Sequence, residues 1–323
     1  MDAFRAPRWL PGGHAQTIWP ALFGRAHEGP PVPWRRERWD TPDGDFIDVD
    51  FATPEAAPGA PCLVLFHGLE GSSASPYARA FAALAAGRGW HFAVPHFRGC
   101  SGELNRAPRA YHSGDFEEIG WILQRLRARA GRPLLVVGVS LGGNALFRWA
   151  EEAGDEGARS AAAVAAISSP LDLTASGNAI GQGLNLRIYT PWFLKTMKPR
   201  ALAKWQQHPG LFDRELMLRA RTLAEFDDVF TGPVHGFAGT EDYWRRASAK
   251  PQLADIRIPA LALNATNDPF IPAWSLPRRN EVGRFVELWQ PAHGGHVGFP
   301  GGPFPGRLDT LPRQVCDWLA RHL

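Results

Sequence analysis

The sequence predicts an α/β domain built on a mostly parallel, doubly wound sheet. Apolar segments with strand character alternate with helix-like segments from residue 62 to residue 167 and resume after residue 260, the order that crossovers between parallel strands require. Segments 38–41 and 46–51 flank the turn Pro42-Asp43-Gly44-Asp45, a pattern typical of a hairpin at an antiparallel N-terminal edge. A chain of 323 residues, 45% of them hydrophobic, is long enough for one such domain with an insertion.

The remaining elements follow from their local patterns. Continuous apolar runs bounded by polar or glycine-rich turns predict buried strands, and longer segments with one apolar face predict helices. On this basis we expect strands at 62–66, 91–97, 134–137, around 164, at 260–263 and at 285–289, and helices near 77–86, at 115–129 and from 144 to about 154.

Two segments interrupt this alternation within the expected single domain, 1–323. Residues 1–36 are rich in proline and are expected to run extended over the surface. Residues 174–250 are helical in tendency, contain many large apolar side chains and have no clear strand. We interpret them either as a cap that roofs a site and supplies an apolar acyl pocket, or as helices that pack on the sheet in the ordinary way.

The most informative motif is Gly138-Val139-Ser140-Leu141-Gly142. It follows the apolar run 134–137 and precedes a helix-compatible segment. Strand, sharp turn and helix in this order form a nucleophile elbow, in which a strained turn lifts a serine hydroxyl out of the sheet. The glycines leave room for neighbouring backbone, and Gly143 eases close packing at the start of the helix. Ser140 is therefore the candidate nucleophile.

A nucleophilic serine needs a base and an acid that orients the base, and after this kind of elbow they follow in the order acid, histidine. Asp268 follows the strand at 260–263, at the carboxyl end where an open parallel sheet places its ligands, and it is the candidate acid. Asp172, after the strand around 164, is the alternative. His296 is the candidate base, and His293 competes with it. The two histidines also match an H-x-x-H metal pattern, but no third ligand stands at suitable spacing.

Two backbone amides complete the predicted site as an oxyanion hole. One belongs to Leu141, directly after the nucleophile, and the other to Leu69, in the loop His67-Gly68-Leu69-Glu70-Gly71. Gly68 permits the turn that points the Leu69 N–H inward. His67 is expected to be a hydrogen-bonded supporting residue. Chemistry of this kind needs no cofactor.

Composition excludes several classes of function. The net charge is only +3, and arginines are scattered rather than clustered in a stripe, which argues against nucleic-acid binding. The cysteines Cys62, Cys100 and Cys316 are odd in number and lack C-x-x-C spacing, so neither a disulfide framework nor a zinc site is predicted. No apolar stretch reaches signal-peptide or membrane-spanning length. A cytoplasmic location is expected, with peripheral membrane contact and oligomeric state left open.

Several motifs together resemble one family. They are Gly13-His14-Ala15-Gln16-Thr17, the segments 67–72, 97–102, 111–115, 168–173, 264–269 and 294–299, and the elbow. In these motifs the chain is similar, over nearly its whole length, to the YheT-like branch of the α/β-hydrolases, which implies the α/β-hydrolase fold with a helical cap. That branch includes bacterial predicted hydrolases, yeast medium-chain ethyl-ester synthases that also act as esterases, and animal membrane-bound acylglycerol lipases and phospholipases. The resemblance implies a triad of Ser140, Asp268 and His296, and it flags His14, Asp115 and Asp242 without giving them a role.

The function hypothesis is a serine carboxylic-ester hydrolase that acts on short- to medium-chain acyl esters through an acyl-enzyme on Ser140. One alternative is an acyltransferase or ester synthase that uses an alcohol in place of water. Another is a catalytically silent small-molecule-binding protein of the same fold, which is disfavoured because competent residues occupy all three triad positions. A haloalkane dehalogenase is disfavoured because its nucleophile would be a carboxylate.

Overall fold

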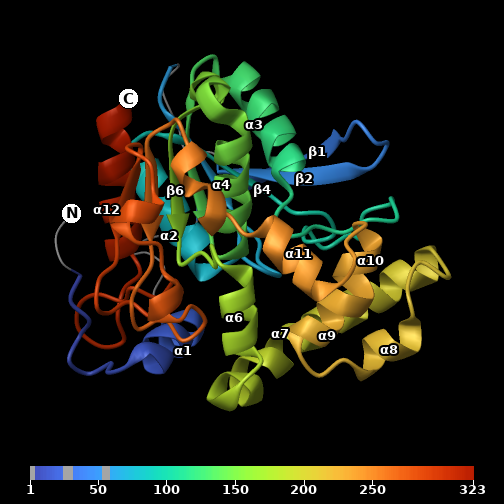
Figure 1. Ribbon diagram of the computed structural model, residues 1–323. Helices are drawn as coiled ribbons and strands as arrows, with labels where there is room; N and C mark the ends of the chain where they lie inside the picture. Colours follow the sequence, from blue (N-terminus) through green and yellow to red (C-terminus); the bar gives the residue numbers. More distant parts are fainter. Residues whose placement is uncertain (1–3, 25–31, 53–58) are drawn as a thin grey trace.

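The structure, a computed structural model, describes residues 4–24, 32–52 and 59–323, and it contains an eight-stranded sheet (Figure 1). The strands are β1 (Trp34–Asp40), β2 (Phe46–Ala52), β3 (Cys62–Phe66), β4 (His91–Pro95), β5 (Leu134–Val139), β6 (Ala161–Ile167), β7 (Ala260–Leu263) and β8 (Val286–Trp289). Their spatial order is β1-β2-β4-β3-β5-β6-β7-β8. Strand β2 pairs antiparallel with β1 and β4, and the other pairs are parallel. The predicted mostly parallel sheet with an antiparallel N-terminal edge is confirmed.

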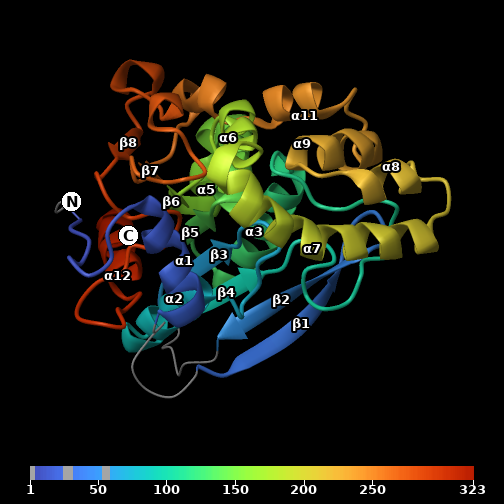
Figure 2. The same cartoon turned by 90° about the horizontal axis from the view of Figure 1, so that it is seen from below.

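Helices cover both faces of this sheet. Helices α2 (Pro76–Gly87) and α12 (Thr310–Leu319) pack on one face, and α3 (Phe116–Ala130) and α4 (Leu141–Ala153) pack on the other (Figures 1 and 2). A hydrophobic core lies on each face of the sheet, and strand β5 contributes side chains to both. Val136 packs with residues of α3 and α4, and Val137 packs with residues of α2 and α12. All six residues of β5 are buried, which explains their continuous apolar run. The short α5 (Gly157–Ser160) leads into β6.

The N-terminal segment differs from the prediction. Residues 1–36 were expected to be extended, but Gly13–Phe23 form helix α1. The prolines at 7 and 11 precede this helix, and Pro20 inside it removes only the hydrogen bond that the Gln16 carbonyl would accept. Packing of α1 against the loops after β7 and β8 decides the local structure, and it overrides the extended tendency of the flanking sequence. The expectation for residues 1–3 and 25–31 falls outside the described residues.

Residues 173–247 form a group of helices inserted between β6 and β7. They are α6 (Leu173–Ile180), α7 (Gly183–Gln207), α8 (Arg214–Arg219), α9 (Leu223–Phe226), α10 (Gly232–Val234) and α11 (Thr240–Ala247), with a π-helical turn at Asp227–Thr231. Figure 1 shows them together at one end of the sheet. They have an apolar core of their own that includes Met197, Met217 and Phe230. These helices, here called the cap, therefore form a layer apart from the helices on the sheet faces. None of the helices in the described part of the chain has the length and apolar character needed to cross a bilayer.

Asn144, in the first turn of α4, ties three segments together. Its side chain is fully buried. Nδ2 donates to the carbonyl oxygens of Ser113 at 2.8 Å and Ala247 at 2.7 Å, and Oδ1 accepts from the Ala249 N–H at 3.1 Å. The amide thus joins the start of α4 to the loop before α3 and to the end of the cap.

Asn144→Ala is expected to lower the free energy of unfolding by about 3 kcal/mol, because it leaves two buried carbonyl groups and a buried N–H without this partner. Urea unfolding followed by circular dichroism measures the change. The matched control is Asn280→Ala, at an exposed position, for which a change within about 0.5 kcal/mol is expected. An Asn144→Ala protein as stable as the wild type would contradict this account of the fold.

Candidate active site

Ser140 occupies the sharp turn between β5 and α4. Its backbone has φ 53° and ψ −121°, a conformation that is strained for any residue with a side chain. Its N–H donates to the carbonyl oxygen of Ile167 on β6 at 2.8 Å, which holds the turn against the sheet. A Cβ atom on Gly142 would lie 2.4 Å from the carbonyl oxygen of His67, and one on Gly143 would lie 1.9 Å from Ser169 Oγ. The Cβ atom on Gly143 would also lie 2.8 Å from the carbonyl oxygen of Gly138. Close backbone therefore requires glycine at 142, and backbone and the Ser169 hydroxyl together require it at 143.

The structure brings Ser140, His296 and Asp268 into one line of hydrogen bonds. Ser140 Oγ lies 3.0 Å from His296 Nε2, and His296 Nδ1 lies 2.9 Å from Asp268 Oδ2. The carboxylate of Asp268 is fully buried, and its second oxygen accepts from the N–H of Phe270 at 2.8 Å. Since a carboxylate only accepts, Nδ1 carries the proton and Nε2 is free to accept from Ser140. The Phe270 ring packs on the imidazole with 4.2 Å between ring centroids.

The alternative acid and base have other places in the structure. Asp172 caps helix α6, where its Oδ1 accepts from the N–H of Ala175 at 3.0 Å. His293 is exposed, and neither residue is hydrogen-bonded to Ser140. Within residues 4–24, 32–52 and 59–323, no three His, Cys, Asp or Glu side chains are placed to hold a metal ion.

The amides of Leu69 and Leu141 are available for an oxyanion. Neither N–H has a hydrogen-bond acceptor within the described part of the chain. The amides on both sides of Leu69 are occupied, since Gly68 N–H donates to Tyr77 Oη at 2.9 Å and Glu70 N–H donates to Tyr111 Oη at 3.0 Å. The two tyrosines thereby fix the loop around a single unused donor, which is the arrangement that an oxyanion hole needs.

The buried side chain of His67 holds the same loop through hydrogen bonds. Burial lowers the pKa of its imidazole to about 3, so the ring is neutral at ordinary pH. Its Nε2 accepts from the N–H of Phe97 at 3.1 Å, and its Nδ1 therefore donates to the carbonyl oxygen of Gly68 at 2.8 Å. His67 is thus a buried, hydrogen-bonded residue that holds Gly68.

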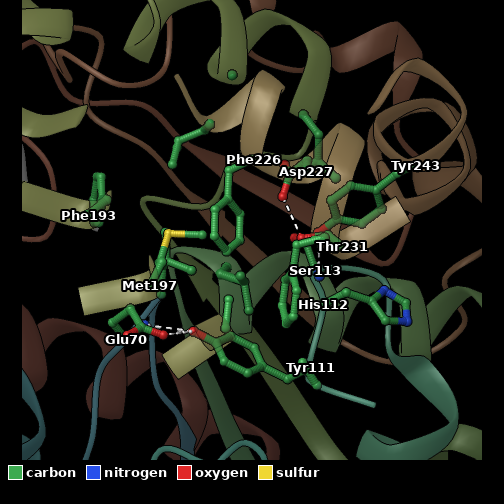
Figure 3. Close-up of a pocket in the computed structure, with 18 of the residues that line it drawn as sticks. Glu70, Tyr111, His112, Ser113, Phe193, Met197, Phe226, Asp227, Thr231 and Tyr243 are labelled. Atoms are coloured by element: carbon green, nitrogen blue, oxygen red, sulfur yellow. Dashed lines mark hydrogen bonds between the residues drawn. The ribbon is translucent and has the colours of Figure 1, made fainter. Parts of the chain in front are cut away.

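Ser140 lies where two cavities meet. The first cavity lies beneath the cap, and its lining includes Leu141, Met197, Phe226, Asp227 and Tyr243 (Figure 3). The second lies between α1 and α7, and its lining includes Thr17, Tyr77, Trp192 and His296. Leu69, Ser140 and Phe270 line both cavities. The Ser140 hydroxyl therefore has open space in two directions.

The three flagged residues do not contact Ser140. His14 Nδ1 is 3.0 Å from Tyr189 Oη on α7. Asp115 pairs with Arg109 at 2.6 Å. Asp242 pairs with Arg245 and Arg246 on its own helix and accepts from the N–H of Ala238. The sequence did not predict a role for Asn144 or Phe270. Asn144 binds residues that lie 31 to 105 positions away in the chain. Phe270 contacts Asp268 and His296 from a loop of irregular structure.

Comparison with known families places the chain in a class. A family model described as alpha/beta hydrolase fold matches residues 61–303. The match spans most of the chain, so the protein belongs to the α/β hydrolase fold family, and the predicted fold is confirmed.

Individual relatives narrow this class. The chain is 39% identical over 314 residues to the putative esterase YheT of Escherichia coli (strain K12), a match that covers 96% of this chain and 91% of that protein. It is 29% identical over 308 residues to the mouse phospholipase ABHD3, covering 91% and 74% of the two chains. The predicted membership of the YheT-like branch is therefore confirmed.

Solved structures share the fold. An esterase from Thermogutta terrifontis superimposes with a TM-score of 0.52 at 15% identity, covering 89% of this chain and 99% of that one. A bacterial membrane phospholipase A superimposes with a TM-score of 0.55 at 16% identity, covering 90% and 87%. At these identities the likeness concerns the fold alone.

Asp227 places a carboxyl group on the wall of the first cavity (Figure 3). One oxygen accepts from Thr231 Oγ1 at 2.6 Å and the other from Trp244 Nε1 at 2.9 Å. Burial raises the pKa of this carboxyl to about 6, because the hydrogen bonds only partly offset its removal from water.

This raised pKa predicts how Asp227 affects stability with pH. Because the folded state holds the proton of Asp227 more tightly than the unfolded state does, protonation of this carboxyl stabilises the folded state. This stabilisation is fully present below about pH 4 and is lost as the pH rises through about 6. Asp227→Asn removes this dependence, so the melting temperature of the variant minus that of the wild type is expected to increase between pH 4 and pH 7. Thermal melts followed by circular dichroism measure the difference, and Asp155→Asn, at an exposed position, is the matched control. A difference that does not change with pH would rule out the raised pKa.

Proposed function

We propose that this α/β hydrolase of the esterase and lipase type is a serine carboxylic-ester hydrolase that acts on short- to medium-chain acyl esters through an acyl-enzyme on Ser140. The hydrogen-bonded line from Asp268 through His296 to Ser140, at the junction of two cavities, is the observation that carries the proposal. Relatives named esterase and phospholipase support the same reaction class.

Acylation begins when Ser140 Oγ attacks the ester carbonyl carbon. His296 Nε2 lies 3.0 Å from this hydroxyl and accepts its proton. The resulting imidazolium is stabilised by the buried carboxylate of Asp268, which also fixes the ring orientation. The carbonyl oxygen becomes negative and is held by the N–H groups of Leu69 and Leu141.

Collapse of this intermediate breaks the bond to the alcohol. His296 donates its proton to the leaving alkoxide, and the acyl group remains as an ester on Ser140. A water molecule then attacks the acyl carbon while His296 accepts its proton. The bond from the acyl carbon to Ser140 Oγ breaks, His296 returns the proton to Oγ, and the carboxylic acid leaves. The side chains and backbone amides of the site, with one water molecule, are sufficient for each proposed step.

The two cavities offer room for the two parts of the proposed substrate. Both cavities have largely apolar walls, but only the first extends beneath the cap, where Met197, Phe226 and Phe230 line it, so it suits the acyl chain. His296, the residue that protonates the leaving group, lines the second cavity and not the first. The alcohol therefore leaves through the second cavity.

Replacing the nucleophile tests the mechanism. Hydrolysis of p-nitrophenyl esters with acyl chains from two to sixteen carbons is expected to peak at short or medium chains. In Ser140→Ala, kcat is expected to fall at least about 10³-fold, with the far-ultraviolet circular dichroism unchanged. Ser160→Ala, at a serine that lines neither cavity, is the control and is expected to retain full activity. Equal hydrolysis by the wild type and Ser140→Ala would refute the assignment.

Covalent labelling separates an enzyme from a silent binding protein. A fluorophosphonate is expected to label the folded wild type stoichiometrically and to leave Ser140→Ala unlabelled, because only an activated serine attacks the reagent. Folded wild-type protein that stays unlabelled would support the binding-protein alternative.

Filling the first cavity tests the acyl assignment. Met197→Trp is expected to lower kcat/KM for an eight-carbon ester at least about tenfold while leaving the two-carbon ester within about threefold, because the added ring occupies space that only the longer chain needs. Leu216→Trp makes the equivalent change at an exposed cap position, 52% accessible, and is expected to behave as the wild type. An unchanged chain-length profile in Met197→Trp would place the acyl chain elsewhere.

A further inference from the structure

Helix α1 lies against the loops that carry Asp268 and His296 (Figures 1 and 2). A Cβ atom on Gly13 would lie 1.8 Å from the carbonyl oxygen of Asn267, and one on Gly298 would lie 1.8 Å from the carbonyl oxygen of Gln16. Only glycine permits backbone to approach backbone this closely. The helix is thus seated directly on both loops, with no layer of side chains between them.

Gln16 and Asn267 form a ring of hydrogen bonds with the base loop. Gln16 Oε1 accepts from Asn267 Nδ2 at 2.9 Å and from the Gly294 N–H at 3.0 Å. Asn267 Oδ1 accepts from the Gly295 N–H at 3.0 Å. Gln16 Nε2 donates to the Leu10 carbonyl at 2.9 Å. The oxygen and the nitrogen of both side-chain amides are therefore all hydrogen-bonded. Asn267 precedes Asp268 and Gly295 precedes His296, so the ring sets the spacing of acid and base.

Thr17 holds the base residue itself. Its Oγ1 donates to the Gly13 carbonyl at 2.7 Å and accepts from the backbone N–H of His296 at 2.9 Å. The hydroxyl therefore connects the helix backbone to the residue whose side chain must face both Asp268 and Ser140.

A second route from α1 reaches the imidazole ring. His14 contacts the hydroxyl of Tyr189 on α7, and the Tyr189 ring packs on Phe270 with 4.5 Å between centroids. Phe270 in turn packs on His296 and donates its N–H to Asp268. Both the backbone and the ring of His296 are thus supported from the N-terminal helix.

We infer that Gln16, Thr17 and Asn267, here called the N-terminal clamp, are positioning residues of the catalytic triad. The clamp holds the His296 loop on the Asp268 loop and fixes the direction of the imidazole, although none of its side chains takes part in the triad's own hydrogen bonds. The inference rests on the proposed catalytic role of Ser140. A displacement of about 1 Å in a reacting group lowers the rate up to about 100-fold, so loss of the clamp is expected to act on catalysis before it acts on the fold.

Three variants test the clamp. Gln16→Met keeps the length of the side chain and removes both its acceptor and its donor. Thr17→Val removes the hydroxyl, and Thr17→Ser keeps it. With p-nitrophenyl butyrate, Gln16→Met and Thr17→Val are expected to lower kcat about 10- to 100-fold. KM is expected to stay within about twofold, because Gln16 lines neither cavity and Val keeps the shape of Thr17 in the wall of the second cavity. Thr17→Ser is expected to stay within about threefold of the wild type. Leu22→Ala, at an exposed position of the same helix, is the matched control and is expected to keep full activity.

A spectroscopic measurement separates positioning from general destabilisation. The imidazole N–H proton that His296 donates to Asp268 gives a downfield proton resonance, which is expected to shift or broaden in Gln16→Met and Thr17→Val and to persist in Thr17→Ser. Wild-type kcat together with an unchanged resonance in both Gln16→Met and Thr17→Val would overturn the clamp. If Gln16→Met fails to fold, the Thr17→Val and Thr17→Ser pair decides. If the wild type neither hydrolyses esters nor reacts with a fluorophosphonate, the proposed function fails, and the resonance alone decides whether the clamp sets the imidazole.

Discussion

The close approach of the elbow to the strands beside it is the constraint on which the rest of the site depends. Gly142 lies against the carbonyl oxygens of Phe66 and His67 at the end of β3. The loop with the Leu69 amide starts there, and a Cβ atom on Gly68 would lie 3.2 Å from that of Ser140. The packing that holds Ser140 in its strained turn therefore also brings the loop with the Leu69 amide next to Ser140, so one backbone contact assembles two parts of the candidate site.

Strain at the site persists because paired polar groups surround it. Ser140, Ser168 and Val297 all have positive φ values, each of which costs free energy unless neighbouring contacts fix it. The Ser140 N–H donates a hydrogen bond to the carbonyl oxygen of Ile167 on β6, and the Val297 N–H donates one to Ser168 Oγ at 3.0 Å. Buried networks of this kind are rigid when every member is satisfied. The same principle links Asn144, His67 and the N-terminal clamp, which hold separate loops through neutral amide, imidazole and hydroxyl groups.

Elements whose structure depends on neighbouring residues could be predicted from the sequence, and elements that depend on contacts between distant residues could not. Alternating patterns predict the sheet, and the elbow motif with two strand ends leads to Ser140, Asp268 and His296, which the structure brings together. The helix α1 was missed because its support comes from partners 251 and 278 residues away, and no local pattern reports such contacts. Helix α12 was also missed, although Leu311, Val315, Trp318 and Leu319 repeat with helical spacing, so that signal was present in the chain.

A crystal structure of the protein after reaction with a medium-chain alkyl phosphonate tests the central claim most directly, because the adduct mimics the tetrahedral intermediate. The account predicts phosphorus bonded to Ser140 Oγ, with the phosphonyl oxygen about 2.7 to 3.1 Å from the amide nitrogens of Leu69 and Leu141. It also predicts the alkyl chain in the cavity beneath the cap. An adduct on another residue, or a phosphonyl oxygen turned away from both amides, would contradict it.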